Sequence, residues 1–304
     1  MNRLAPFFVI VAASLWAVDG IVLRPVLFSL PVTLVVFVES IIVAVLLTPF
    51  MIKYIGDVKA LEWKDWLAFL GVALFGGAIG TMAITKALFY VNYVNLSIVI
   101  LIQKLQPVFA ISLAAIFLKE KLPTEFFLWS GLAIGGAYFM TFGFHLPDFT
   151  NVDKTALAAL FSLIAALSFS SSTVLSKRAL KNVSFELGTY LRFAITSMIM
   201  LFVVLIPGTI NNITDISTKQ IYIFLLIAFT TGGPAIFLYY FGLKKISASV
   251  ASICELAFPL TAVILEYVIR DNLLGPIQWI GTFFLLLSIV RVTSIRAIPV
   301  ETSI

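Results

Sequence analysis

The chain of 304 residues is poor in the side chains that build disulfides, metal clusters and soluble surfaces. It has one cysteine, Cys254, so it forms neither an internal disulfide nor a thiolate metal cluster. Its single histidine, His145, excludes a paired-histidine metal site. Charged residues make up only 12% of the chain, against roughly 25% in a soluble domain. The sequence therefore predicts no metal and no cofactor, and it argues against a water-soluble fold.

Apolar side chains are what the chain has in excess, at 61% of all residues and with 28 phenylalanines. A soluble domain is about 45–50% apolar, and a fold of this size could not hide the surplus. A helix needs about 20 apolar residues to cross the roughly 30 Å hydrocarbon layer. The runs predict an all-α polytopic membrane protein with ten transmembrane helices, near residues 5–23, 32–52, 66–88, 95–118, 126–144, 155–174, 188–206, 220–241, 250–269 and 277–292.

The basic residues are dispersed between these spans, which does not favour nucleic-acid binding and is typical of a protein that fixes its orientation in a membrane. If the N-terminus is cytoplasmic, thirteen of the 20 Lys and Arg residues fall on that side and five, including Arg24, fall on the other. Lys104 and Arg192 remain inside spans. We therefore expect a multi-pass protein of the cell membrane with both termini in the cytoplasm. The first span is long for a signal peptide and contains Asp19, so we expect it to be an uncleaved helix.

The two halves of the chain align on their own residues. A shift of 152 positions places Pro107 on Pro259, in the middle of the fourth and ninth spans. Each half holds five helices, an odd number, so the second half must enter the membrane upside down. The prediction is two inverted five-helix repeats, residues 1–148 and 149–304.

The paired prolines mark a candidate site. A proline inside a helix removes a backbone hydrogen bond and frees carbonyl groups. In folds with inverted repeats, ligand sites lie near the midplane between the repeats. We expect Pro107 and Pro259 to interrupt their helices beside a shared central cavity, although a simple kink is the alternative.

Several short motifs are distributed over the two halves of the chain. They are Leu15 to Ala17, Leu118 to Leu122 after Pro107, Trp129 to Gly131, and Lys245 to Val250 followed by Pro259 and Leu274. In these motifs the chain resembles the EamA-type transporters of the drug/metabolite transporter superfamily. The resemblance implies a ten-helix alternating-access carrier for small metabolites, whose relatives move amino acids, sugars, nucleotide sugars or drugs, commonly outward. The family often has an arginine in the second helix of each repeat. Arg192 fits this pattern, but Glu39 stands at the first position, and Glu120 is matched by Asn272 in the second half.

Charged and amide side chains inside the spans are the candidate machinery, because a charge at mid-bilayer costs about 2.5–3.5 kcal/mol unless it is paired or hydrated. We expect Glu39 to approach Lys104 in the outer half, and Arg192 to approach Glu255 in the inner half. Such pairs would gate the two mouths of the cavity, or they would be purely structural. The residues expected to bind substrate or protons or to gate the cavity are Trp16, Asp19, Glu39, Gln103, Lys104, Gln106, Arg192 and Glu255.

The function that these features favour is a secondary transporter that moves an amino acid, a sugar or a drug-like amphiphile, in the export direction. A carboxylate without a partner would bind protons and couple transport to them. A channel-like protein or a facilitative uniporter is the alternative. An intramembrane enzyme is disfavoured, because the sequence has neither a Gly-x-Ser-x-Gly nor a His-Glu-x-x-His motif. The expected partners are the substrate and the lipid bilayer, with the chain as a monomer or a homodimer.

Overall fold

A computed structural model describes residues 4–89, 99, 102–103, 105–144, 152–270 and 275–295. The described part of the chain is helical and contains no strand. The α-helices are α1 (Ala5–Val18), α2 (Val32–Met51), α3 (Ile55–Lys59), α4 (Trp63–Val72), α5 (Gly80–Phe89), α7 (Gln106–Phe117), α8 (Thr124–Phe142), α9 (Val152–Ala179), α10 (Phe185–Leu205), α11 (Thr218–Ile227), α12 (Gly233–Leu243), α13 (Ala248–Cys254), α14 (Ala257–Arg270) and α15 (Pro276–Ser294). Short π-helical and 3₁₀ segments extend several of them: η1 (Asp19–Leu23), η2 (Arg24–Leu27), η3 (Ile52–Tyr54), η4 (Ala73–Ile79), η6 (Thr209–Asp215) and η7 (Ala228–Gly232).

Seven continuous helical stretches are long and apolar enough to cross a membrane, so the chain is a multi-pass membrane protein. They are Ala5–Leu27, Val32–Lys59, Trp63–Phe89, Ala156–Ala179, Phe185–Leu205, Thr218–Leu243 and Pro276–Ser294. Each of the seven overlaps one of the ten predicted spans. The helix predicted near 250–269 is broken into α13 and α14, and the first half of the span near 95–118 lies largely outside the described residues.

The distribution of side chains is the reverse of that in a soluble protein. Large aromatic residues such as Phe117, Phe202 and Phe283 point outward and are 61–71% exposed. Small hydroxyl residues such as Thr85 and Ser170 are fully buried. A surface of this kind is stable against lipid tails but not against water.

Helices from the two halves of the chain pack against one another. The first helix, α1, packs on α12 and α14, and α9 packs on α5 and α7. In addition, α2 packs on α10, and α8 packs on α15. At the last contact the backbones touch, because a Cβ atom on Gly281 would meet backbone atoms of Gly136 and Met140. The contacts of α1 with α12 and α14 thus have counterparts in the contacts of α9 with α5 and α7, with the two halves of the chain exchanged.

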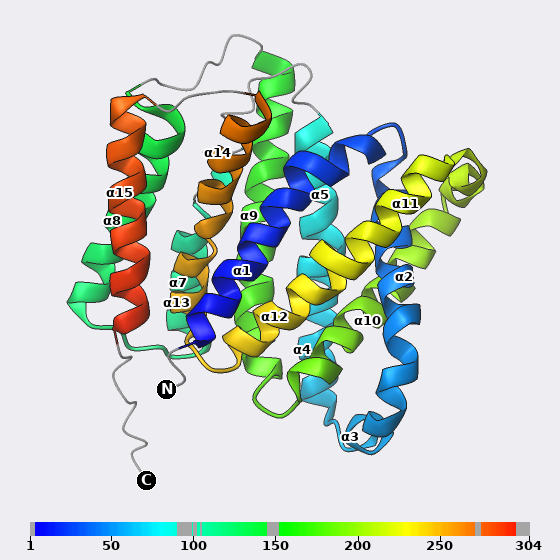
Figure 1. The fold of residues 1–304 in the computed structure, drawn as a ribbon. Coiled ribbons are helices and arrows are strands. Elements are labelled where there is room, and N and C mark those ends of the chain that lie inside the picture. The colour runs from blue at the N-terminus through cyan, green and yellow to red at the C-terminus, as the bar shows by residue number, and fades with distance from the viewer. Residues whose placement is uncertain are drawn as a thin grey trace.

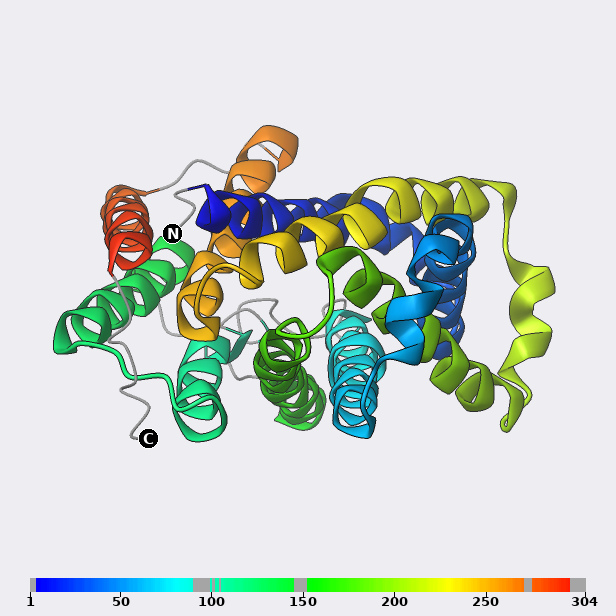
Figure 2. The same cartoon turned by 90° about the horizontal axis from the view of Figure 1, so that it is seen from below.

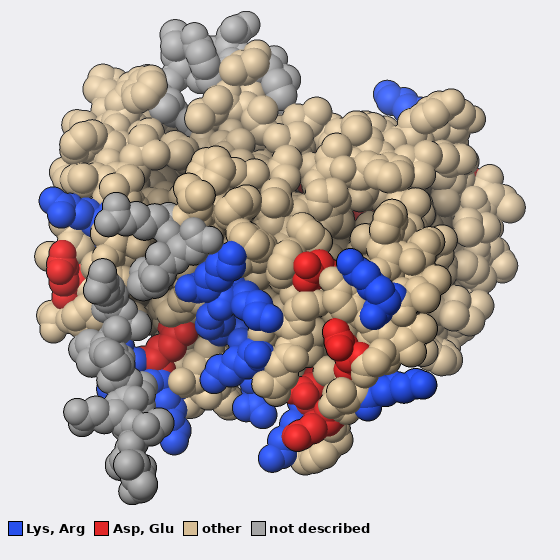
Figure 3. Space-filling model, turned by 60° about the horizontal axis from the view of Figure 1, so that its bottom comes forward, with Lys and Arg blue, Asp and Glu red and all other residues tan. Residues whose placement is uncertain are grey.

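Seen from below, α1, α12 and α11 form one row, and α7, α9 and α4 form a second row that faces it (Figure 2). The pair α8 and α15 lies at one end of the two rows, and α2 with α10 lies toward the other. In Figure 1, α1 begins and α15 ends at the same, lower end of the bundle. Lys and Arg side chains gather at that end (Figure 3). The last turn of α9 carries Lys177 and Arg178 there, and α12 is followed by Lys244 and Lys245.

Candidate functional site: a polar cavity between the two halves

A cavity of about 310 Å³ lies between the two rows of helices. Side chains from α1, α2, α5, α7, α9, α10, α12, α13 and α14 line it, whereas α8 and α15 contribute none of its lining residues. Its volume is at the lower end of the range of about 300–1,000 Å³ that is typical of small-molecule sites. Both halves of the chain thus contribute to one cavity.

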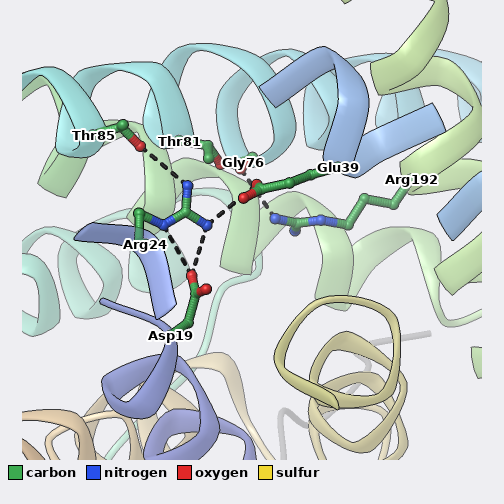
Figure 4. Close-up of polar contacts among 7 residues, drawn as sticks. All are labelled: Asp19, Arg24, Glu39, Gly76, Thr81, Thr85 and Arg192. Atoms are coloured by element: carbon green, nitrogen blue, oxygen red, sulfur yellow. Dashed lines mark hydrogen bonds and ion pairs between the residues drawn. The ribbon is translucent and has the colours of Figure 1, made fainter. Parts of the chain in front are cut away.

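Three charged residues form a buried cluster at one side of this cavity (Figure 4). Arg24 donates to Oδ2 of Asp19 from both Nε and Nη2, at 2.9 and 2.6 Å. Its Nη2 also donates to Oε2 of Glu39 at 3.2 Å, and its Nη1 donates to the Thr85 hydroxyl at 3.3 Å. Each of the three charged residues is 8% exposed. The second carboxylate oxygens, Asp19 Oδ1 and Glu39 Oε1, have no hydrogen-bond partner among the described residues.

The local backbone explains how Arg24 reaches this position. After α1, the chain continues through the π-helical segment η1 and the 3₁₀ segment η2, so the span extends to Leu27 rather than ending near residue 23. Pro25 lies in the first turn of η2, where its missing N–H is not needed. Arg24 is therefore held inside the bundle. The sequence analysis counted Arg24 among the residues that follow the first span, whereas the structure includes it in that span and buries it.

The second arginine of the cavity binds neutral groups. Nη2 of Arg192 donates to the carbonyl of Gly76 at 3.0 Å, and Nη1 lies 3.4 Å from the hydroxyls of Ser172 and Tyr240. Gly76 lies in the π-helical segment η4, and its carbonyl also accepts from Thr81. Figure 4 shows the guanidinium of Arg192 directed toward the side of Glu39 that is opposite Arg24.

The close packing around Gly76 requires a residue without a side chain at this position. A Cβ atom at this position would collide with the Ser172 hydroxyl and would lie 2.9 Å from Nη1 of Arg192. Only a glycine lets the arginine come this close to the backbone of η4.

Glu255 lies where the ninth predicted span is broken. α13 ends at Cys254, and α14 begins at Ala257. A proline at 259 cannot donate to the carbonyl four residues earlier, which is that of Glu255. That carbonyl instead accepts from Phe258 N at 2.9 Å. Pro259 thus accounts for the break, and the break directs the Glu255 side chain into the cavity.

Three polar groups surround the carboxylate of Glu255, a half-buried residue of the cavity wall. Oε2 accepts from Gln106 Nε2 at 2.6 Å, and Oε1 accepts from the Tyr239 hydroxyl at 2.6 Å. Thr173 lies 3.5 Å from Oε1 and 2.8 Å from the Tyr239 hydroxyl. The ring of Trp16 lies 5.2 Å from that of Tyr239, so an aromatic pair flanks the carboxylate. All of these residues line the cavity.

Pro107 has the equivalent position in the first half. It lies in the first turn of α7, which begins at Gln106, and it lines the cavity as Pro259 does. Gln103, the residue four positions before Pro107, also lines the cavity and donates to the carbonyl of Ser162 at 3.0 Å. Lys104 lies outside the described residues.

The structure thus brings the described candidates together but changes their partners. Trp16, Asp19, Glu39, Gln103, Gln106, Arg192 and Glu255 all line the same cavity. The expected ion pair between Arg192 and Glu255 is not formed, because each binds the neutral groups described above. Glu39 pairs with Arg24, a residue that the sequence reasoning missed. A lone arginine inside the apolar run from Leu23 to Phe28 was the signal for it.

The described residues contain no group of three or more His, Cys, Asp or Glu side chains that could hold a metal ion. What the cavity offers is a fixed set of hydrogen-bond donors and acceptors, two guanidinium groups, three carboxylates and aromatic rings. Such a set is chemically suited to a polar, partly aromatic small molecule.

Comparisons with known proteins bear on what that molecule is. The model of the EamA-like transporter family matches the chain twice, over residues 3–142 and 156–294. The chain is 44% identical to the riboflavin transporter ImpX of Fusobacterium nucleatum subsp. nucleatum over 289 residues, which is 95% of this chain and 97% of that protein. It is 27% identical to the uncharacterized transporter YwfM of Bacillus subtilis over 188 residues, covering 62% of this chain and 61% of that protein. A solved crystal structure that is 15% identical shares the fold, with a TM-score of 0.68 over 95% of this chain and 94% of that one.

Proposed function

Since the chain belongs to the EamA-like transporter family, we propose that it is a secondary transporter that carries riboflavin across the cell membrane by alternating access. The observation that carries the choice of substrate is the 44% identity to a riboflavin transporter over 95% of the chain. Amino acids, sugars and drug-like amphiphiles, which the sequence alone suggested, become the competitors against which riboflavin is tested.

The chemistry of the cavity supports this choice. Riboflavin joins a flat three-ring system, with carbonyl and N–H groups along one edge, to a chain of hydroxyl groups. The Trp16 and Tyr239 rings offer aromatic surface for the ring system. Next to them, Gln106 and Glu255 offer an amide and a carboxylate for the polar edge. Hydrogen bonds of this kind discriminate strongly, because a ligand without the matching group leaves buried polar atoms unpaired.

An arrangement of ten helices in two inverted repeats, residues 1–148 and 149–304, is part of the proposal. Its support is the way the helix contacts are exchanged between the halves, with α1 on α12 and α14 and α9 on α5 and α7. The third and eighth predicted spans also share a π-helical segment in their middle, η4 and η7 respectively. Two near-equivalent halves give two near-equivalent arrangements, one open to each side, and this is the basis of alternating access.

The orientation that we propose has the basic, lower end of the bundle in the cytoplasm. This places both termini on that side, as the positive-inside rule requires. The cluster of Asp19, Arg24 and Glu39 then lies toward the outer side. We propose that it closes the outer mouth by tying η2 to η1 and α2, the role that was expected from the sequence for Glu39 and Lys104. Export remains the expected direction of net transport.

Proton coupling follows from the charges in the cavity. Its lining includes three carboxylates, Asp19, Glu39 and Glu255, but only two guanidinium groups, Arg24 and Arg192. Among the described lining residues one negative charge is thus left over in a low-dielectric site, where a bound proton would neutralise it. Of these three carboxylates, Glu255 is the one that forms no ion pair with a described residue, so we propose that it carries this proton.

Uptake of radiolabelled riboflavin by proteoliposomes tests the proposed function. Unlabelled riboflavin should compete with saturable kinetics, whereas amino acids, sugars and amphipathic amines at the same concentration should not. Uptake that does not saturate indicates a channel. Saturable uptake of one of the competitors, without uptake of riboflavin, contradicts the substrate assignment.

A further inference from the structure

Glu120, in the loop that follows α7, caps a helix from the other half of the chain. Its Oε1 accepts from the backbone N–H of Ala248 at 2.8 Å. Its Oε2 accepts from the N–H and the hydroxyl of Ser249, at 3.2 and 2.6 Å. These N–H groups are the first two of α13, and Ser247 caps the third through Val250 N. A carboxylate at this position satisfies free donors and the positive end of the helix at once.

The chain adopts an unfavourable backbone conformation to place Glu120 there. Lys119, the residue before it, has a φ of 55°, in the left-handed region that favours glycine. Among the described residues it is the only non-glycine residue with positive φ. This conformation turns the chain back at the end of α7, so that Glu120 N bonds to the carbonyl of Ala114 at 3.3 Å. The contacts of Glu120 with α13 offset the cost of this turn.

The same two helices are joined at their other ends, inside the cavity. α7 begins at Gln106, and α13 ends just before Glu255; these two residues share the 2.6 Å hydrogen bond. The helices therefore run antiparallel, each from a different half of the chain, with a polar contact at both ends. All seven residues of α13 are buried, and the helix spans roughly 10 Å at 1.5 Å per residue. A short, fully packed helix of this kind moves as a unit.

Nearby lysines do not compete for the Glu120 carboxylate. Lys177 Nζ donates to the carbonyls of Leu243 and Lys244, at 2.9 and 3.1 Å. Lys244 Nζ donates to the carbonyl of Val183 at 2.7 Å. These contacts tie α9 and the loop before α10 to the end of α12. Glu120 provides the hydrogen bonds from the first half to the start of α13, where Ala248 also packs against Ala114 of α7.

We propose that Glu120 is a positioning residue that locks α13 to α7 at the lower end of the bundle and thereby sets the position of Glu255 in the cavity. A substrate that binds Gln106 or Glu255 replaces the contact at the cavity end. Of the two polar contacts between α7 and α13, only that of Glu120 then remains, and the lower end opens more readily. This inference rests on the proposed alternating access, and it gives that access a named latch and a route from the bound substrate to it.

Accessibility of a cavity cysteine to a membrane-impermeant thiol reagent tests the latch. The background is Cys254→Ala with Ser40→Cys, since Ser40 is a buried residue of α2 that lines the cavity. Glu120→Ala and Glu120→Gln are compared with Glu125→Ala and Glu125→Gln. Glu125 is an exposed acid five residues further on that bonds only to Trp129 of its own helix, so its loss changes the charge equally without touching α13.

Without substrate, the Glu120 variants should be labelled about tenfold faster from the lower side, which is about 1.4 kcal/mol in the ratio of open to closed molecules. Labelling from the opposite side should fall, and the Glu125 variants should behave like the parent. Riboflavin should speed lower-side labelling of the parent more than that of the Glu120 variants. Equal labelling of all variants from both sides overturns the proposal, and so does a loss of thermal stability with unchanged labelling, which is the result for a purely structural cap.

Ser249→Ala provides a second variant that removes only the 2.6 Å hydroxyl contact and leaves the helix N–H groups capped. It should change the labelling in the same direction by a smaller factor. If Glu120→Ala misfolds, the Ser249→Ala variant decides the test. Labelling rates of Ser249→Ala that equal those of the parent would then contradict the proposal. Labelling needs no transported substrate, so a protein that does not carry riboflavin can still show the latch, and a riboflavin carrier can still fail to show it.

Discussion

Gln106 and Glu255 lie 149 positions apart in the chain, line the same cavity and share a 2.6 Å hydrogen bond. Each lies at the end of a helix that a proline interrupts, Pro107 in one case and Pro259 in the other. The contact joins the two halves of the chain at the place where both break their helices. In the mechanism that we propose, substrate that enters the cavity meets these two side chains together.

Replacing Glu255 by Gln should separate exchange from proton-driven accumulation. The glutamine keeps an oxygen for the Tyr239 hydroxyl but cannot bind or release a proton. Riboflavin exchange should persist with a raised KM, while accumulation driven by a pH gradient should disappear. Proteoliposomes with and without an imposed pH gradient give both rates. Gradient-driven accumulation that survives in this variant would assign the proton to another carboxylate.

Replacing Arg24 by Met should be among the most damaging single changes in the cavity. It leaves the Asp19 and Glu39 carboxylates buried without a cation, and breaking a buried ion pair in this way costs about 3–5 kcal/mol. The thermal midpoint in detergent should fall sharply, and riboflavin transport should be lost. Arg178→Met, which removes an exposed arginine at the end of α9, serves as the control and should change neither.

The triple variant with Asp19→Asn, Arg24→Met and Glu39→Gln completes this test. Because it removes all three charges together, it should recover much of the thermal stability that Arg24→Met loses. A triple variant that is no more stable than Arg24→Met would show that the charges of this cluster are not what holds η2 in place.

Replacing Gly76 by Ala should impair both folding and transport. The added Cβ would collide with Ser172 and crowd Arg192, and overpacking of this kind costs about 1–3 kcal/mol. Gly135→Ala is the matched control on α8, where an added Cβ would meet no atom within 4 Å. That control should be neutral or slightly stabilising, because alanine favours a helix by about 1 kcal/mol over glycine. Thermal midpoints and riboflavin uptake of both variants give the comparison, and equal behaviour of the two would contradict the packing of Arg192 against η4.

A reporter fused after Ile304 should be active on the cytoplasmic side. The basic residues at the lower end of the bundle predict this orientation. A reporter that is active only in the exterior compartment would invert the assignment of the inner and outer mouths.

The sequence predicted the apolar spans well, because a run of about 20 apolar residues has few alternatives to a transmembrane helix. The prolines were informative for a similar reason, since a missing N–H has a definite effect on the carbonyl four residues earlier. For Glu255 that reasoning locates both the break and the side chain.

The partners of the charges could not be predicted in the same way. Counting basic residues by loop placed Arg24 outside the membrane, because nothing in the sequence shows that η1 and η2 prolong the first helix. The position of Arg192 depends on a backbone carbonyl of η4, which no pattern of charged residues reveals. Helix periodicity locates side chains on a regular helix, whereas this site is built where the helices are irregular.

Counterflow of riboflavin is the measurement that tests the central claim most directly. Proteoliposomes are loaded with unlabelled riboflavin, diluted into a trace of labelled riboflavin, and the labelled vitamin inside is followed with time. A carrier that alternates between two accessible states should take up the label transiently above its equilibrium level, and it should do so faster than unloaded vesicles. Labelled riboflavin that equilibrates at the same rate in loaded and empty vesicles, or that does not enter either, would contradict the account.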